Sequence, residues 1–401
     1  MLIAGKKGRT GQTHRFSSGK AMGGIQSILL WANDCAIAIV GCGLVLLLAY
    51  QAYQWQKDKR RANQLRSETS PQLTLTKTPP VSILVPAWNE AAMIERHIQS
   101  FLQLRYPNKE LILCAGGRDG TFDLASQYAS SKVTILIQIE GQGKQAALQQ
   151  CLEHAAGDIL FLADADGLLD DRSFERTLGP LVEKSEQASS GLTRPLPDQF
   201  NQPFALYQWY AEQYSNASTG EYTPVLRGCN SAINRKALEK AGGFSRQAKI
   251  GTDDQLSARL QQSRIPICFV RQSQVANEYP IALRSYIRQQ TRWLRVSILR
   301  SFAHPAWNSL QTGIGFLIYF IPVWLILFTP LLGKISLYFA LAWFGFMVIS
   351  RIRVMEFGRL STGVKLSRKT YAYLPLYLLV DVYTHLLSPL QLLFPPARWK
   401  W

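Results

Sequence analysis

Two carboxylates stand one residue apart after an apolar run in FLADADG, residues 161–167. The run 158–162 predicts a short buried strand, so Asp164 and Asp166 should emerge together at its end. Paired carboxylates in that place suit a hard divalent cation such as Mg²⁺ or Mn²⁺. Such a cation would bridge a diphosphate and stabilise the charge on a leaving group. The alternative is a pair of helix N-cap residues, because Asp is common there.

Two further polar groups could belong to the same site. The segment GTDDQLSARL (251–260) places Asp253 and Asp254 immediately before a predicted helix. Just before a long apolar block, the segment QQTRW (289–293) supplies Gln289, Arg292 and Trp293.

Lys144 follows the glycines of EGQGK and should lie at the start of a helix. Backbone amides at a helix N-terminus favour anions, so we expect Lys144 to contact phosphate, with a plain surface lysine as the alternative. The segment lacks the spacing and the Ser/Thr of a P-loop and does not indicate nucleotide hydrolysis.

Regular elements must position these residues. Strands are predicted at 81–85, 109–116, 133–139 and 158–162, and helical patterns lie between them. Strands that alternate with helices predict an α/β fold with a mainly parallel sheet and helices on both faces. Ligands of such sheets bind at the carboxyl ends of the strands, which is the edge that carries the polar turns.

The ordered set VPAWNE (85–90), DAD (164–166), TDD (252–254) and QxxRW (289–293) resembles the membrane-integral family-2 glycosyltransferases. The resemblance covers about residues 80–300. It implies a GT-A fold with a Rossmann-like sheet, a nucleotide-sugar donor such as a UDP-sugar, a divalent cation, and inverting transfer of a hexose.

The resemblance also implies roles for single residues on the donor side. Glu90 and Asp119 would contact the nucleoside. Asp164 would contact the ribose and the metal, and Asp166 would be the main metal ligand.

On the acceptor side, the resemblance makes Asp254 the general base that deprotonates the acceptor hydroxyl. Arg292 would hold the donor diphosphate with its planar guanidinium. Gln289 and Trp293 would close the site around the acceptor. For Asp253, both N-capping and a direct role in the site remain open.

One turn departs from the family pattern. Family members usually carry an acidic residue at or beside Ala115–Gly117, but this chain reads CAGGRDGT and only Asp119 is acidic. Either Asp119 takes over the contact to the base, or backbone groups recognise it.

Long uncharged runs near both termini predict membrane spans. The run 35–53 is about the ~20 residues needed to cross a bilayer, and it lacks a clear signal cleavage site. A second block covers 314–333 and 335–350, and a third run, 371–394, either spans or is re-entrant. In that run Asp381 and His385 form a buried polar pair or handle the acceptor.

The formal net charge of +17 is concentrated beside these runs, in KDKRR at 57–61 and at 351–369. Basic loops next to spans face the cytosol, so the central domain should be cytosolic and close to anionic lipid. A nucleic-acid partner is not expected, because no nucleic-acid motif is present. The six cysteines lack metal-ligand spacing and suit reduced thiols.

These features predict an integral membrane protein with eight segments. They are a basic tail (1–24), an anchor (25–56), a linker (57–80), the GT-A domain (81–285), an amphipathic interfacial helix (286–313), two transmembrane helices (314–350), a basic cytosolic loop (351–370), and a last span or re-entrant segment with its tail (371–401).

Two enzyme classes fit, and the sequence favours transfer of one sugar to a membrane lipid, as in ceramide glucosyltransferases. Processive polysaccharide synthases generally continue RW into RWxxG, whereas Val296 stands at that glycine position. Three or four spans also make a poor channel for a polymer. A catalytically silent membrane scaffold is a distant alternative. It is disfavoured because all the expected site residues are present.

Overall fold

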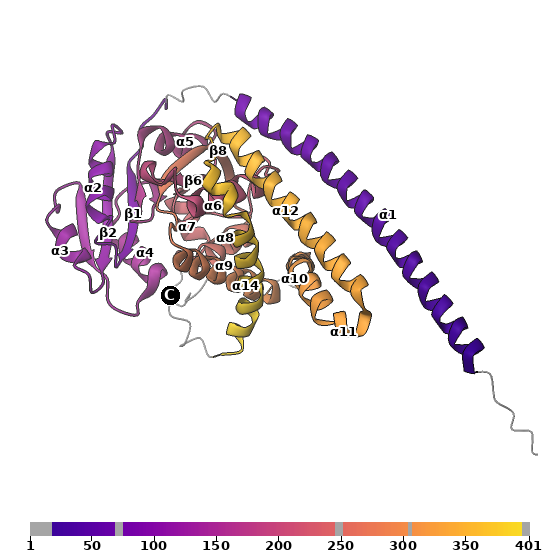
Figure 1. The fold of residues 1–401 in the computed structure, drawn as a ribbon. Coiled ribbons are helices and arrows are strands. Elements are labelled where there is room, and N and C mark those ends of the chain that lie inside the picture. The colour runs from indigo at the N-terminus through magenta and orange to yellow at the C-terminus, as the bar shows by residue number, and fades with distance from the viewer. Residues whose placement is uncertain (1–17, 69–74, 245–251, 304–306, 395–401) are drawn as a thin grey trace, which may run out of the picture. The chain divides into compact units, whose positions relative to one another are not determined.

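The computed structural model describes residues 18–68, 75–244, 252–303 and 307–394. It forms two compact units, one of Met1–Tyr53 with Phe320–Phe346 and one of Gln54–Tyr319 with Met347–Trp401. The elements in chain order (Figure 1) are α1 (Ser18–Ser67), β1 (Val81–Trp88), α2 (Ile94–Gln103), β2 (Lys109–Gly116), α3 (Thr121–Ser126), β3 (Val133–Ile137), α4 (Gly143–His154), β4 (Ile159–Leu162), β5 (Gly167–Leu168), α5 (Asp171–Glu183), β6 (Ala188–Pro195), the 3-10 helix η1 (Pro197–Gln199), α6 (Pro203–Ser215), β7 (Ser231–Asn234), α7 (Arg235–Lys240), α8 (Thr252–Gln262), β8 (Cys268–Asn277), α9 (Leu283–Ala303), α10 (Trp307–Leu327), α11 (Thr329–Leu332), α12 (Lys334–Thr362), α13 (Arg368–Ala372) and α14 (Leu374–Leu392).

The second unit contains an eight-stranded sheet in the order β3-β2-β1-β4-β7-β6-β8-β5. β1 pairs in parallel with β2 and β4, and β2 with β3, as predicted for the first half of the domain. β7 then runs antiparallel to β4 and to β6, so the sheet is mixed in its second half although mainly parallel. The predicted α/β class is confirmed.

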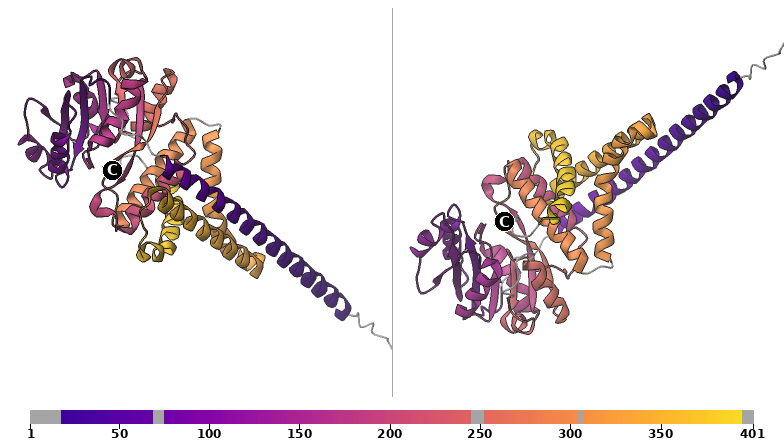
Figure 2. Two further views of the ribbon diagram at one scale, coloured as in Figure 1. Left: turned by 90° about the horizontal axis from the view of Figure 1, so that it is seen from above. Right: turned by 90° about the horizontal axis from the view of Figure 1, so that it is seen from below.

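Helices cover both faces of this sheet, as Figure 2 shows from two sides. Alternate residues of β1, such as Ile83 and Val85, pack with α2 and α5 in one core. The residues between them, such as Leu84, pack with α4, α7 and α8 in the other. Because β1 is buried on both faces, its sequence is a continuous apolar run rather than an alternating one.

A helical layer completes the second unit. α9 packs along α14, and Phe204 and Tyr207 of α6 join Tyr286 of α9 and Tyr377 of α14 in a shared aromatic core. The rings of Tyr207 and Tyr377 are stacked with their centroids 4.0 Å apart. Residues 286–303 of the helix expected at 286–313 lie in α9, which the aromatic core attaches to the α/β domain, whereas residues 307–313 already belong to α10. The interfacial character of the helix stays a prediction.

In the described part of the chain, α12 is the one helix that is long and apolar enough to cross a membrane. The apolar part of α10, residues 313–327, is shorter. In the first unit, the Gln51 side chain of α1 donates to the Phe346 carbonyl of α12 at 3.3 Å. The predicted span at 35–53 lies within α1, but many of its side chains are outside the described residues.

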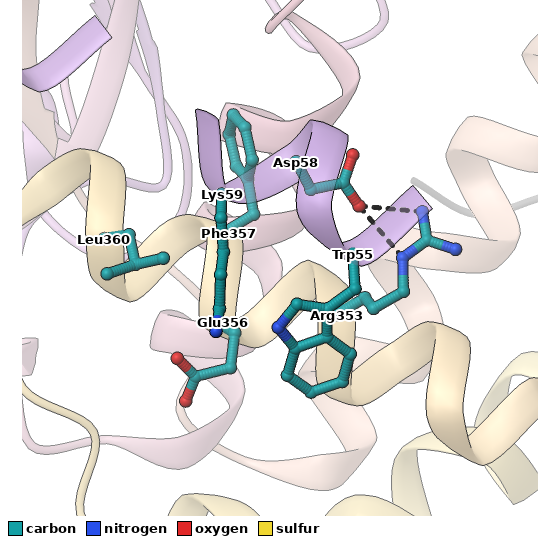
Figure 3. Close-up of a pocket in the computed structure, with 7 residues that line it drawn as sticks. All are labelled: Trp55, Asp58, Lys59, Arg353, Glu356, Phe357 and Leu360. Atoms are coloured by element: carbon teal, nitrogen blue, oxygen red, sulfur yellow. Dashed lines mark hydrogen bonds and ion pairs between the residues drawn. The ribbon is translucent and has the colours of Figure 1, made fainter. Parts of the chain in front are cut away.

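Two segments predicted as connections are helical instead. The linker expected at 57–80 begins as the last turns of α1, and the loop expected at 351–370 begins as the end of α12. The many charged residues of these segments led to the prediction of loops, but two of them form an ion pair between the two helices. Arg353 contacts Asp58 at 2.7 Å, and both line the small pocket shown in Figure 3. Phe357 and Ala62 are buried together nearby.

Asp381 and His385 form the buried polar arrangement that the sequence left as one alternative. Asp381 pairs with Arg351 of α12 at 2.7 Å and accepts a hydrogen bond from the Tyr207 hydroxyl at 3.2 Å. The Nδ1 atom of His385 lies 2.7 Å from the Asp381 carbonyl, and its ring stacks on Tyr319. These contacts join four helices of the second unit.

Candidate active site

Asp164 and Asp166 lie after β4, in the turn that leads into β5. The Gly167 N–H closes this turn by donating to the Asp164 carbonyl at 3.1 Å. β5 pairs with the end of β8, where the Asn277 amide donates to Asp166 Oδ1 at 3.0 Å. The Glu278 N–H donates to the Asp166 carbonyl at 3.0 Å. Asp166 is therefore held through both its side chain and its main chain.

Lys144 lies in the first turn of α4 and reaches two acids. Its Nζ atom is 2.8 Å from Asp164 Oδ1 and 3.7 Å from Asp253 Oδ1. The Gly228 N–H donates to the other oxygen of Asp253 at 3.1 Å. A Cβ atom on Gly228 would stand 2.6 Å from Asp253 Oδ1, so this close approach requires glycine. Lys144 thus links the DAD turn to the first turn of α8.

Asp253 rather than Asp254 makes the contact with Lys144. Leu256 and Leu260 of α8 are buried in the core, and Asp253 lies on their side of the helix, three residues before Leu256. Asp254 is the next residue of the same first turn and is partly exposed. The structure therefore brings Lys144, Asp164 and Asp253 together. Asp254 directly follows Asp253 in the chain.

The acids at this edge raise one another's pKa values. Burial, followed by the charge of Asp164, raises the pKa of Asp166 to about 7, although Lys144 opposes the shift. Burial, followed by Asp166 and Asp164, raises the pKa of Glu90 to about 8. Glu278 contributes to both shifts. Because a proton stabilises the cluster, a bound cation would stabilise it as well.

Nearby acids also raise the pKa values of two neighbouring groups, Lys144 and Cys229. Burial alone would lower the pKa of Lys144, but attraction to Asp164 and Asp253 outweighs it and raises that pKa. Burial and the same acids raise the pKa of the Cys229 thiol well above its usual value. Lys144 is therefore a permanent cation, and Cys229 is a neutral thiol. The described cysteines, Cys42, Cys114, Cys151, Cys229 and Cys268, are all free, as predicted.

Asp119 ties together the turns that follow β1 and β2. Its Oδ2 atom accepts from the Ala91 N–H at 3.0 Å, and its Oδ1 atom accepts from the Thr121 hydroxyl at 2.6 Å. That hydroxyl accepts from the Glu90 N–H at 2.7 Å. Asp119 therefore positions Glu90, and its expected contact with a nucleoside stays a prediction.

The unusual turn at Ala115–Gly117 has no space for an acidic side chain at its glycines. A Cβ atom on Gly116 would lie 2.4 Å from the Gln138 carbonyl oxygen and 2.9 Å from the Trp88 ring. Gly117 has a φ of +124°, which residues with side chains rarely adopt. The departure from the family pattern is thus built into the backbone of the turn.

Gln289, Arg292 and Trp293 lie on α9. Arg292 and Trp293 are exposed, and the Gln289 side-chain oxygen is buried without a hydrogen-bond partner in the described part of the chain. Within that same part, none of the three forms a hydrogen bond or an ion pair with Asp164 or Asp166. Their expected roles remain predictions.

Sequence reasoning missed several residues of this site. Asn277 ends a strand, β8, that the sequence did not predict, and Glu278 directly follows it; Gly228 was not singled out either. The signal in the sequence was weak, because only two apolar residues, Val275 and Ala276, precede the polar pair Asn277 and Glu278. His97 was also missed, and its imidazole contacts the carbonyl of Gly167, directly after the DAD residues.

The donor set fits a hard divalent cation. Carboxylate oxygens of Asp164 and Asp166 are suitable ligands, and the raised pKa of Asp166 reflects its burial and the negative charge of Asp164. No three acidic, His or Cys side chains in the described ranges are arranged to hold a metal by themselves. Mg²⁺ and Mn²⁺ sites of this kind use one or two carboxylates and take the remaining ligands from phosphates and water.

Comparison with known proteins agrees with this arrangement. The family model described as "Glycosyltransferase like family 2" matches residues 79–295. The probable glycosyltransferase YdaM of Bacillus subtilis is 26% identical over 246 residues, covering 55% of this chain and 56% of that protein. Beta-monoglucosyldiacylglycerol synthase of Trichormus variabilis is 23% identical over 299 residues, covering 70% of this chain and 62% of that protein. Both matches span less than two thirds of the relative.

Among solved structures, a mannosyltransferase from Pyrobaculum calidifontis in complex with GDP-Man and Mn²⁺ superposes with a TM-score of 0.53. It is 18% identical in sequence, and the match covers 88% of this chain and 98% of that one. A likeness at this level of identity concerns the fold. It supports a GT-A-like α/β domain.

Proposed function

This chain belongs to the glycosyltransferase-like family 2, and from that premise we propose that it is an inverting hexosyltransferase that transfers one sugar from a nucleotide-sugar to a membrane lipid. The proposed carrier is UDP. The observation that carries the proposal is the convergence of Lys144, Asp164, Asp166 and Asp253 at the carboxyl edge of the sheet. Ligands of this fold class bind at that edge.

On the donor side, Asp166 and Asp164 would hold a divalent cation, which would neutralise the diphosphate and the charge that develops on the leaving group. Lys144 stands at the N-terminus of α4, where the helix amides also favour phosphate. With the charge of Asp164 engaged by the cation, Lys144 can turn from that acid to a phosphate oxygen. Glu90 lies beside these acids and would face the nucleoside.

On the acceptor side, Asp254 would accept the proton of the lipid hydroxyl as that oxygen attacks the anomeric carbon. Attack opposite the leaving diphosphate inverts the anomeric centre, so an α-linked donor would give a β-linked product. Asp253, held by Lys144 and Gly228, would fix the first turn of α8. The base would therefore be presented from a turn already anchored to the donor site.

The proposed lipid acceptor rests on three observations. The helix α9, with Arg292 and Trp293 exposed, is attached to the catalytic domain through the aromatic core with α14. The helix α12 can cross a membrane by its length and composition. The similarity to a glucosyldiacylglycerol synthase extends over 70% of the chain. We therefore place the protein in a membrane, with its catalytic domain on the cytosolic side and α9 near anionic lipid headgroups.

The decisive test compares the parent with Asp254→Asn in purified, full-length form. Each is incubated with Mn²⁺, total lipid extract and a panel of radiolabelled nucleotide-sugars, including UDP-glucose. We expect label in the organic phase for the parent and a loss of about a hundredfold or more for the variant. The matched control is Asp123→Asn, which changes an exposed acid of α3 and should keep parental activity.

The same assay separates the other functions. Insoluble label of high mass would replace the lipid acceptor by a growing polysaccharide. Equal incorporation by Asp254→Asn and the parent would remove Asp254 from the chemistry. No incorporation from any donor by the parent would favour a silent scaffold.

A further inference from the structure

Helix α2 contacts the main chain directly after the DAD residues through the side chain of His97. His97 is fully buried, and its Nδ1 atom lies 2.7 Å from the Gly167 carbonyl oxygen. A carbonyl oxygen only accepts, so Nδ1 carries the hydrogen and donates it. Gly167 directly follows Asp166, and the Gly167 N–H closes the turn onto Asp164. The imidazole therefore contacts the Gly167–Leu168 peptide group, which lies in β5 directly after the acidic pair.

The imidazole is held as a neutral donor. Burial lowers the pKa of His97, so the ring stays uncharged at neutral pH. Its Nε2 atom is buried without a hydrogen-bond partner in the part of the chain that the structure describes. An unsatisfied buried nitrogen is destabilising, and an apolar residue would avoid it. The histidine thus offers the turn one hydrogen bond that an apolar core residue cannot provide.

A second side chain of α2 strengthens this contact. The Ser100 hydroxyl, one helical turn after His97, accepts from the Leu169 N–H at 3.0 Å and donates to the His97 carbonyl at 2.6 Å. Asp166 is also held by the Asn277 side chain at the end of β8 and by the Glu278 N–H directly after it. The segment is therefore fixed between two elements that are remote in sequence.

We propose that His97 is a positioning residue that holds the DAD turn in the geometry required to bind the divalent cation. The proposal rests on the proposed function, in which Asp164 and Asp166 are the cation ligands. These acids repel each other and Glu90, so without a clamp the turn can open and separate them. Binding a cation to an open turn requires the two acids to be brought together again, which weakens the affinity.

The test uses substitutions that differ in one donor group. His97→Leu removes the hydrogen bond, whereas His97→Asn keeps an amide N–H at the position of Nδ1. Mn²⁺ binding to the full-length protein is measured by the electron paramagnetic resonance signal of free Mn²⁺. We expect the dissociation constant to rise about fivefold in His97→Leu and to stay near the parental value in His97→Asn. Thermal unfolding in EDTA reports folding separately.

A control distinguishes positioning from general stability. Ser82→Ala removes a buried hydroxyl that bonds Glu110 and the Gly157 N–H on the same sheet, away from the turn. It should lower the melting temperature and leave Mn²⁺ affinity unchanged. Should His97→Leu fail to fold, His97→Gln replaces it, because its amide lies one bond further from the main chain and should show the same weakened binding.

The outcomes separate this proposal from the proposed function. Mn²⁺ affinity within twofold of the parent in folded His97→Leu or His97→Gln would overturn the role of His97 while leaving sugar transfer intact. A parent that transfers sugar but binds no Mn²⁺ would overturn both this role and the cation site. An equal loss of affinity in His97→Asn and His97→Leu would show that the donated hydrogen bond is not what matters.

Discussion

The crowding of acids at the DAD turn makes the stability of the cation-free protein depend on pH. The pKa of Asp166 is raised to about 7 from the usual 3.8, so between these values the folded state keeps a proton that the unfolded state has released. The contribution of Asp166 to stability is therefore greatest at low pH and is lost as the pH rises through 7. Glu90, with its pKa raised to about 8, acts in the same direction.

The size of the effect follows from the shift of Asp166. For that residue alone, raising the pH from 6 to 8 should lower the free energy of unfolding by about 1.4 kcal/mol. For a domain of this size, 1 kcal/mol corresponds to about 2–4 °C in melting temperature. The melting temperature should therefore fall by about 3–6 °C over this range, and Glu90 should enlarge the fall.

The measurement is thermal unfolding of the full-length protein in detergent and EDTA, followed by tryptophan fluorescence. Asp166→Asn is the matched variant, because it keeps the size of the side chain and does not titrate. Between pH 6 and 8, the melting temperature of this variant should fall by about 3–6 °C less than that of the parent. Saturating Mn²⁺ should reduce the pH dependence of the parental melting temperature. Equal pH dependence in the two cation-free proteins would refute the reasoning.

Four other substitutions test single contacts. Lys144→Met removes the positively charged side chain of the site and should raise the KM for the donor about tenfold or more. Arg353→Met leaves Asp58 without its partner and should lower the free energy of unfolding in a denaturant titration by about 3 kcal/mol, whereas Arg359→Met, which breaks a more exposed pair, should cost less than about 1 kcal/mol. Gly228→Ala should displace the acid beside it and reduce the rate of transfer in the radiolabel assay, with little change in melting temperature.

The sequence indicated that Asp164 and Lys144 lie at the same edge of the sheet, for a physical reason. Parallel strands end at one edge of a sheet, so polar residues that follow such strands must lie near one another. Strand β4 and helix α4 were both recognisable from their apolar patterns, and Asp164 and Lys144 do meet at 2.8 Å. Local pattern and topology together were sufficient for this contact.

The second half of the sheet could not be predicted in the same way. The middle of β8 is polar, and its Ser273 hydroxyl is buried in a hydrogen-bonded network with Thr177 of α5 and Asn230. A polar residue reads as exposed when its partners are unknown, and these partners lie far away in the chain. Asn277 and Glu278 were missed with the strand that carries them.

The choice between two neighbouring acids depends on the rotation of a helix. The family resemblance assigned the base to Asp254, whereas the contact with Lys144 is made by Asp253. Leu256 and Leu260 set which side of α8 faces the core, and this side includes Asp253. The helical spacing of Asp253, Leu256 and Leu260 was visible in the sequence. Which acid reaches the site, however, depends on the element that packs against this side of α8, here the first turn of α4 with Lys144.

The charges of the site also constrain the order of binding. The acids around Asp166 repel a diphosphate, and Lys144, the cation beside them, is already engaged by Asp164 and Asp253. A nucleotide-sugar without a cation would therefore meet an unfavourable field. With a divalent cation on the acids, the charge of Asp164 would be satisfied and Lys144 would be available to a phosphate. Under the proposed function we therefore expect the cation to bind before the donor or together with it, so donor affinity measured in EDTA should be far weaker than in Mn²⁺. Equal affinity in the two conditions would mean that Lys144 and the amides of α4 bind the diphosphate without help from the acids.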